Sequence, residues 1–184
     1  MTYDLEPGLG PRPELGLALD RACDGDLPAL TSLYDGAARW MREHGIDQWQ
    51  PGGKDAEHFR LRMREGEVWL ARVGAAVVGA YELWWRDEQA WGAQPPVAGH
   101  VHRLMVDRTT APRGTGRALL AHAEGRIAGS GRALCRLDCR ADNPVLVRYY
   151  EDAGYAVVGE LREKTDGGGS PYAVTLMEKA LPVR

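Results

Sequence analysis

The residues best suited to chemistry gather at a glycine-rich turn between an expected strand and an expected helix. The stretch 111–117 reads APRGTGR and follows an apolar strand that ends at Val106. Glycine lets a backbone approach a ligand closely and point its N–H groups at it. A helix N-terminus adds partial positive charge, and Arg113 and Arg117 add full charges. The turn could therefore cradle a pyrophosphate, although a turn that only redirects the chain would use the same glycines.

Two histidines lie on the strand just before this turn. His100 and His102 are two positions apart, so both rings should point to one face of that strand. Histidine exchanges protons near neutral pH, which makes the pair candidate general bases. Glu82 on an adjacent expected strand is a rival base. The alternative is that both histidines are satisfied by neighbours or face solvent.

A second constellation follows in the pattern Asn-Pro-x5-Tyr-Glu-Asp-Ala-Gly-Tyr, which starts at Asn143. Asn143 is a strong helix cap with proline after it, and Tyr150 lies two helical turns further on the same face. A tyrosine hydroxyl aimed at a ligand could donate a proton. The alternative is an N-cap and a core tyrosine.

The elements that must position these residues alternate along the chain. Period-two patterns predict strands, helical spacing and caps predict helices, and glycines mark the turns. Strands are expected at 15–19, 68–73, 77–85, 100–106, 133–139, 155–161 and 172–177. Helices are expected at 24–41, 55–64, 116–130 and 143–153. This order predicts a mixed α/β or α+β sheet that is not all-parallel.

Length and composition favour one globular domain. The chain has 184 residues, 44% of them hydrophobic and 27% charged. We expect a tail over 1–13, which carries three prolines, and a single domain over 14–184. The formal net charge of −3 does not favour nucleic acid or anionic membranes as partners.

The three cysteines, Cys23, Cys135 and Cys139, are too few and too scattered for a disulfide framework, and no metal-binding spacing occurs. No apolar run is long enough for a membrane span, and the N-terminus does not resemble a signal peptide. These features predict a cytoplasmic protein without a metal centre.

Together, the strand ending at Val106, the glycine turn and the Asn143 pattern resemble the GNAT superfamily of acyl-CoA-dependent N-acetyltransferases. The resemblance extends over about 15–180 and is strongest in 100–160. It implies a central, mostly antiparallel sheet of about seven strands with four helices. Family members carry Gln or Arg where this chain has Ala111.

The resemblance also implies roles for individual residues, with acetyl-CoA as co-substrate. Backbone groups of Leu104, Met105 and Val106 would meet the pantetheine arm, and Asn143 would hydrogen-bond it. Tyr150 stands where the family has its general acid, and the spacing of His100 and His102 resembles the arylalkylamine branch. The residues that would hold the pyrophosphate are Pro112, Arg113, Gly114, Thr115, Gly116 and Arg117.

The acceptor side is less defined. Most of the six tryptophans fit core or edge packing. Trp49 differs because it lies in the loop 45–53, which in the family walls the acceptor pocket. Gln48 and Trp49 could therefore contact an apolar or aromatic amine. An acetyl-cysteine route through Cys139 is disfavoured, because a buried strand cysteine is usually inert.

These inferences predict an N-acetyltransferase that moves an acetyl group from acetyl-CoA to the primary amine of a small molecule or peptide. The amine would attack directly in a ternary complex. An acyl-CoA-binding module without turnover, and a nucleotide-binding α/β protein, remain as alternatives. Dimers are common in the family, so a homodimer is compatible with the resemblance.

Overall fold

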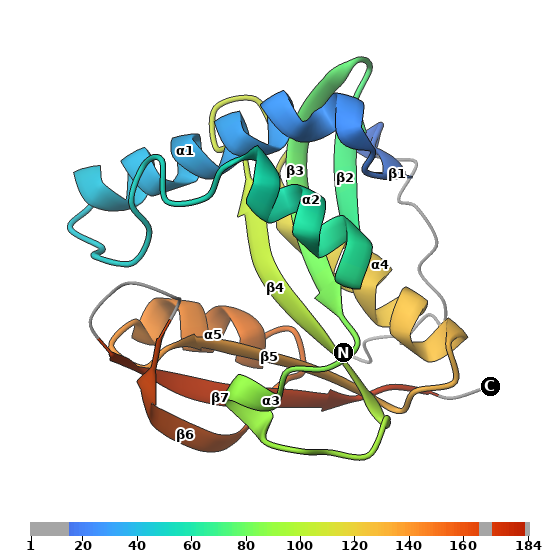
Figure 1. The fold of residues 1–184 in the computed structure, drawn as a ribbon, viewed down its shortest axis with the longest axis vertical. Coiled ribbons are helices and arrows are strands. Elements are labelled where there is room, and N and C mark those ends of the chain that lie inside the picture. The colour runs from blue at the N-terminus through green and yellow to red at the C-terminus, as the bar shows by residue number, and fades with distance from the viewer. Residues whose placement is uncertain (1–14, 166–170, 183–184) are drawn as a thin grey trace, which may run out of the picture.

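The computed structural model describes residues 15–165 and 171–182, so the expected N-terminal tail and the Gly167–Gly169 turn lie outside the described residues. Within these ranges, seven strands form one sheet in the order β1-β2-β3-β4-β5-β7-β6 (Figure 1). Neighbouring strands pair antiparallel, except for β4 and β5, which are parallel. The predicted mixed, mostly antiparallel sheet is confirmed.

The bounds of the elements follow the predicted order. The strands are β1 (Ala18–Arg21), β2 (Glu67–Val73), β3 (Ala76–Trp84), β4 (Ala98–Val106), β5 (Leu134–Arg140), β6 (Ala156–Lys164) and β7 (Tyr172–Ala180). The helical elements are η2 (Asp24–Asp26, a 3-10 turn), α1 (Leu27–Glu43), α2 (Ala56–Glu65), α3 (Glu88–Trp91), α4 (Thr115–Gly129) and α5 (Pro144–Glu151).

The short helix α3 is an addition to the four predicted helices. It lies in the connection between β3 and β4 and begins at Asp87, whose side-chain oxygen accepts the backbone N–H of Ala90 at 3.2 Å. A helix of a single turn has no hydrophobic period, so the sequence pattern could not reveal it.

Helices cover both faces of the sheet. Figure 1 shows α1 and α2 on the near side of β2, β3 and β4, and α4 on the far side. Successive residues of β2 divide between the two sides, with Leu70 in the core under α1 and α2 and Ala71 in the core under α4. Because both faces are buried, the central strands read as apolar runs rather than alternating ones. None of the described helices is both long and apolar enough to cross a membrane.

The parallel pair β4 and β5 separates soon after it forms. Its register runs only from Ala98↔Leu134 to His100↔Arg136, although β4 continues to Val106 and β5 to Arg140. Beyond His100, the β5-facing edge of β4 therefore has no strand partner among residues 15–165 and 171–182. This divergence opens the sheet on the side where the glycine turn lies.

A β-bulge bends β4 in the stretch beyond His100, where the strand is no longer paired with β5. The β3–β4 register passes from Ala80↔Met105 to Glu82↔His102, so Arg103 and Leu104 stand opposite one residue of β3. Arg103 has a φ of 45°, in the left-handed region that is strained for a residue with a side chain. Bulges of this kind bend a strand and redirect its side chains.

Candidate active site

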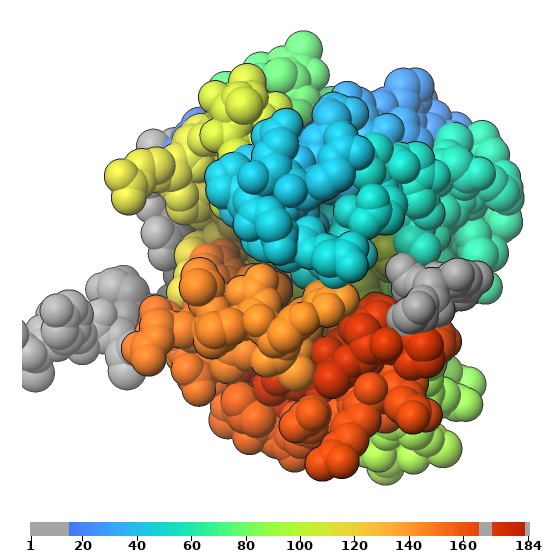
Figure 2. Space-filling model, turned by 90° about the vertical axis from the view of Figure 1, so that its left-hand side faces the viewer, coloured from blue at the N-terminus to red at the C-terminus, as the bar shows by residue number. Residues whose placement is uncertain are grey.

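A cleft of about 930 Å³ lies where β4 and β5 diverge. Its floor includes Leu104 and Val106 of β4, and α5 borders it with Leu146 and Tyr150. The end of α1 and the loop after it form the opposite wall. Figure 2 shows this wall in cyan above α5 in orange. The cleft is large enough for an extended, flexible ligand arm.

The glycine turn provides free backbone donors to this cleft. Gly114 caps α4 with a φ of 93°, and the Ala118 N–H donates to the Gly114 carbonyl at 2.9 Å. Because intrahelical bonding starts at Ala118, the N–H groups of Gly116 and Arg117 have no acceptor within the helix. A Cβ built on Gly116 would lie 2.8 Å from the Tyr149 Oη, so a larger residue here would have to displace the Tyr149 hydroxyl.

The structure brings some of the predicted cofactor residues to the cleft and leaves others outside it. Those that line it are Leu104, Val106, Gly114, Gly116, Arg117 and Asn143. Those that do not are Met105, Pro112, Arg113 and Thr115. Met105 packs in the core under α1 and α2, and the buried Thr115 hydroxyl donates to the Pro112 carbonyl at 2.8 Å. The contacts proposed for Met105 and Thr115 would therefore be through the backbone.

Gln48 and Trp49, the two residues predicted for the acceptor side, lie in different surroundings. Gln48 lines the cleft, whereas Trp49 stacks on Tyr34 with ring centroids 5.1 Å apart. Trp49 thus packs against α1, and its contact with an acceptor stays a prediction.

Asn143 and Tyr150 both line the cleft from α5. The Asn143 side-chain oxygen accepts the Leu146 N–H at 3.1 Å, so the amide NH₂ is the part it can offer a ligand. Burial raises the pKa of Tyr150 well above its usual value, and the nearby Cys139 adds to this. The hydroxyl therefore stays protonated at neutral pH, as a proton donor must.

Glu82 is fully buried and held by three donors. They are Arg103 at 2.7 Å, His58 at 2.9 Å and the Trp84 indole at 3.0 Å. Burial would raise the pKa of Glu82, but the charge of Arg103 and the contact with His58 outweigh it and lower the pKa. Glu82 thus holds the Arg103 side chain at the β-bulge through this contact. Its role as a base stays an untested prediction.

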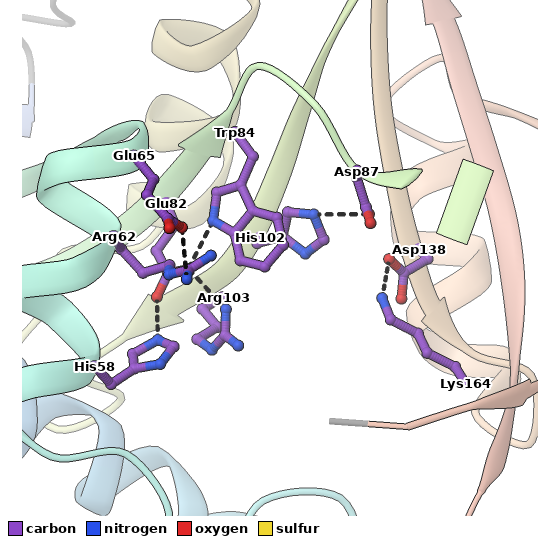
Figure 3. Close-up of polar contacts among 10 residues, drawn as sticks. All are labelled: His58, Arg62, Glu65, Glu82, Trp84, Asp87, His102, Arg103, Asp138 and Lys164. Carbon is purple, nitrogen blue, oxygen red and sulfur yellow. Dashed lines mark hydrogen bonds and ion pairs between the residues drawn. The ribbon is translucent and has the colours of Figure 1, made fainter. Parts of the chain in front are cut away.

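The two strand histidines differ sharply in their surroundings. His100 is buried, and burial lowers its pKa to about 4, so its ring is neutral at pH 7. Its Nδ1 has no hydrogen-bond partner within the part of the chain that the structure describes. The His102 ring stacks on Trp84, with centroids 4.0 Å apart, and its Nε2 lies 3.1 Å from the Oδ2 of Asp87 (Figure 3).

A buried ion pair lies beside His102. Lys164 donates to the Oδ1 of Asp138 at 2.6 Å, and both side chains are about nine-tenths buried. Ligand atoms of Asp87, His102 and Asp138 all lie within 4.8 Å of one another. The spacing would suit a cation, and the Lys164 ammonium already provides one beside Asp138.

Comparison with known proteins decides the family. A model of the acetyltransferase (GNAT) domain matches residues 38–176, well over half of the chain. The chain belongs to the GNAT acetyltransferase family. The predicted family and enzyme class are confirmed.

This GNAT chain is similar to one named relative in sequence and to solved acetyltransferase structures in fold. It is 32% identical over 147 residues to YesJ of Bacillus subtilis (strain 168), named an uncharacterized N-acetyltransferase, with 73% of this chain and 78% of YesJ covered. A GNAT-family acetyltransferase from Listeria monocytogenes superposes with a TM-score of 0.71 at 26% identity, covering 90% of this chain and 95% of the other. PaiA N-acetyltransferase from Thermoplasma acidophilum, solved in complex with coenzyme A, gives 0.66 at 19% identity, covering 89% and 98%.

Several cleft residues of this GNAT domain escaped the sequence analysis. Trp40 and His44 stack at 4.1 Å on the end of α1, and the Arg108 guanidinium lies 3.7 Å from the Trp40 ring. Tyr149 also lines the cleft, with the Arg117 guanidinium 4.2 Å from the centre of its ring. On a helix, such residues look like core or surface positions until the partner element is known. Only the loop position of Gln48 gave a signal for this wall.

Proposed function

We propose that this GNAT acetyltransferase transfers an acetyl group from acetyl-CoA to the primary amine of a small molecule or peptide, by direct attack in a ternary complex. The observation that carries the proposal is the cleft between the diverging β4 and β5, with the free N–H groups of Gly116 and Arg117 at its glycine turn. The complex of PaiA with coenzyme A supports the choice of cofactor.

The residues present fit such a cofactor. A pyrophosphate requires N–H donors and positive charge, which the start of α4 and Arg117 offer. The unpaired edge of β4 past His100 offers backbone groups to an extended amide-containing arm, as the NH₂ of Asn143 does from α5. Bound acetyl-CoA would supply the activated acetyl thioester.

Protein groups would then accept one proton from the amine, donate another to the thiolate, and stabilise the negative charge that develops on the carbonyl oxygen. An alkylamine is mostly protonated at pH 7, so a base must accept a proton before or during attack. We assign this to His102, because Glu82 is occupied by three donors and His100 is deeply buried. A strand N–H at Met105 or Val106 would stabilise negative charge on the carbonyl oxygen. Tyr150 would protonate the departing thiolate.

A thermal melt with acetyl-CoA tests the cofactor step. At about a hundred times the dissociation constant, a ligand of the folded state adds about 2.7 kcal/mol, or roughly 5–10 °C for a chain of this size. Gly116→Ala should abolish most of the shift, because its Cβ would meet the Tyr149 hydroxyl at 2.8 Å and crowd the turn. Gly125→Ala in the same helix is the matched control, because its Cβ meets nothing within 4 Å.

A panel of amines tests the transfer step, with release of free thiol as the readout. Turnover of any primary amine supports the proposal. A clear acetyl-CoA shift with no transfer to any amine would favour an acyl-CoA-binding module instead. A shift with ATP that acetyl-CoA does not displace would favour a nucleotide-binding protein.

A further inference from the structure

Asp87 is held so that one of its oxygens faces His102. It is the N-cap of α3, where its Oδ1 accepts the Ala90 N–H. That bond fixes the carboxylate plane and leaves Oδ2 3.1 Å from the Nε2 of His102, with the Asp87 side chain only 2% exposed. Both atoms are buried and neither completes a well-aligned hydrogen bond. Such contacts between catalytic groups are often loose without substrate and tighten during reaction.

The ring of His102 is fixed from a second side. Trp84 stacks on it from β3, with the ring planes 29° apart. No described residue makes a hydrogen bond to the Nδ1 of His102. One ring nitrogen therefore faces a carboxylate while the other makes no bond to a described residue, and His102 itself is not among the residues that line the cleft. In Figure 3 the ring lies between the Glu82 group on one side and Asp87, Asp138 and Lys164 on the other.

Two carboxylates and one ammonium group lie close to this ring. Asp87 and Asp138 bring two negative charges, and Lys164 returns one positive charge, so the net charge facing a neutral His102 is negative. Beyond them, Glu82 is balanced by Arg103 and His58 on its own side. His100, on the same strand, stays neutral at pH 7. Uptake of one proton by His102 would therefore leave the cluster close to neutral.

Asp87 itself remains ionised through this cycle. Burial would raise its pKa, but the contact with His102, the charge of Lys164 and the Ala90 N–H outweigh burial and lower the pKa to about 2. The negative charge opposite His102 is thus permanent at any pH at which the enzyme would work.

We propose that Asp87 is the positioning residue of an Asp87–His102 dyad, in which Asp87 orients the imidazole and stabilises it once it has taken the proton of the acceptor amine. The inference rests on the proposed function. In the balanced step, the amine nitrogen bonds to the acetyl carbon and the carbon–sulfur bond breaks. The amine proton ends on His102, and the thiolate receives its proton from Tyr150.

The dyad would also explain why the β3–β4 connection is held in place against β6. This connection carries α3 and delivers Asp87 to the sheet, and the Gln89 side chain fastens it by donating to the Thr165 carbonyl at 2.5 Å. Lys164 precedes Thr165, so the same contact holds α3 next to the ion pair with Asp138. Trp84 of β3, Asp87 at the start of α3, and the Asp138–Lys164 pair of β5 and β6 therefore surround His102 of β4.

Asp87→Asn separates positioning from capping. Asparagine caps a helix as well as aspartate does, so α3 should persist while the charge opposite His102 is lost. We expect kcat to fall about 10- to 100-fold, with a smaller change in the acceptor KM. The acidic limb of the pH–rate profile should move to lower pH, since the carboxylate charge opposite the protonated ring is lost. His102→Gln should remove that limb.

The matched control is Asp55→Asn. Asp55 caps α2 through the His58 N–H at 2.9 Å in the way that Asp87 caps α3, but its carboxylate faces no histidine ring. The Asp55→Asn variant should keep the wild-type pH–rate profile. If Asp87→Asn also kept the wild-type kcat and profile, the dyad would be refuted while the acetyltransferase proposal stood.

A titration of the His102 ring protons by NMR tests the dyad without turnover. The titration midpoint should move to lower pH in Asp87→Asn and stay in place in Asp55→Asn. If no amine is acetylated but the midpoint still moves, the proposed function fails and the Asp87–His102 coupling stands. An unmoved midpoint contradicts the inference directly.

Discussion

At the scale of single residues, the molecule separates charged groups that hold structure from groups that can exchange protons. Glu82 and Arg103 show the first kind, since their contact at 2.7 Å lies next to the bulge where Arg103 has a φ of 45°. Strained backbone persists only when its surroundings fix it, and a fully buried carboxylate with three donors does this. Breaking such a buried pair on one side is strongly destabilising. His102 has one carboxylate beside its Nε2 in place of three donors, which is why we place the base there.

His100 predicts how stability depends on pH. Its pKa falls from 6.5 to about 4 on folding because the ring is buried, so the unfolded chain binds a proton in that window and the folded chain does not. The free energy of unfolding should therefore fall as pH drops from 6.5 to 4, by up to about 3 kcal/mol from this residue. The corresponding window of Asp87 lies lower, between 3.8 and about 2. Urea unfolding at several pH values measures the slope.

His100→Gln should flatten this slope, because glutamine does not titrate. A wild-type slope in His100→Gln would show that the ring is not held neutral by its burial.

At the scale of elements, the sequence predicted what depends on local chemistry. The Asn143–Pro144 start of α5 and the glycine turn before α4 follow from capping and backbone freedom, and both lie where they were expected. The bulge at Arg103 and the contact of Asp87 with His102 were not predictable. A bulge is a matter of register between strands, and Asp87 meets His102 only because the β3–β4 connection folds back across the sheet. The wall at Trp40 likewise depends on how α1 crosses β4.

Asn143 has two roles at the start of α5 that substitutions can separate. Asn143→Ala loses the cap on the Leu146 N–H and should lower the free energy of unfolding by about 1 kcal/mol. Asn143→Asp keeps the cap but replaces an NH₂ donor with negative charge in the cleft. It should leave stability near the wild-type value and weaken acetyl-CoA binding by about tenfold or more. Urea unfolding and calorimetric titration measure the two effects. Equal acetyl-CoA affinity in wild type and Asn143→Asp would remove Asn143 from the binding site.

At the scale of the whole molecule, two half-sheets meet at one short junction. Strands β1 to β4 form one half and β5, β7 and β6 the other, and the register between β4 and β5 spans only Ala98, Gly99 and His100. Helix α4 covers the junction, with Ile127 packed directly on Gly99. The angle at which the halves diverge sets the width of the cleft, so we expect packing at Gly99 to affect acetyl-CoA binding.

Gly99→Ala tests this coupling far from the glycine turn. Its Cβ would lie 2.5 Å from the Cγ1 of Ile127, so the helix or the junction must shift. We expect a loss of about 1–3 kcal/mol in the free energy of unfolding, as for other overpacked cores. Acetyl-CoA affinity should fall as well, because the two halves supply opposite sides of one cleft: Leu104 and Val106 from β4, Arg140 from β5. Ile127→Ala removes all three side-chain atoms that the new Cβ would meet, so the double variant should recover part of the loss in acetyl-CoA affinity. An affinity that stays at the Gly99→Ala value would contradict the coupling.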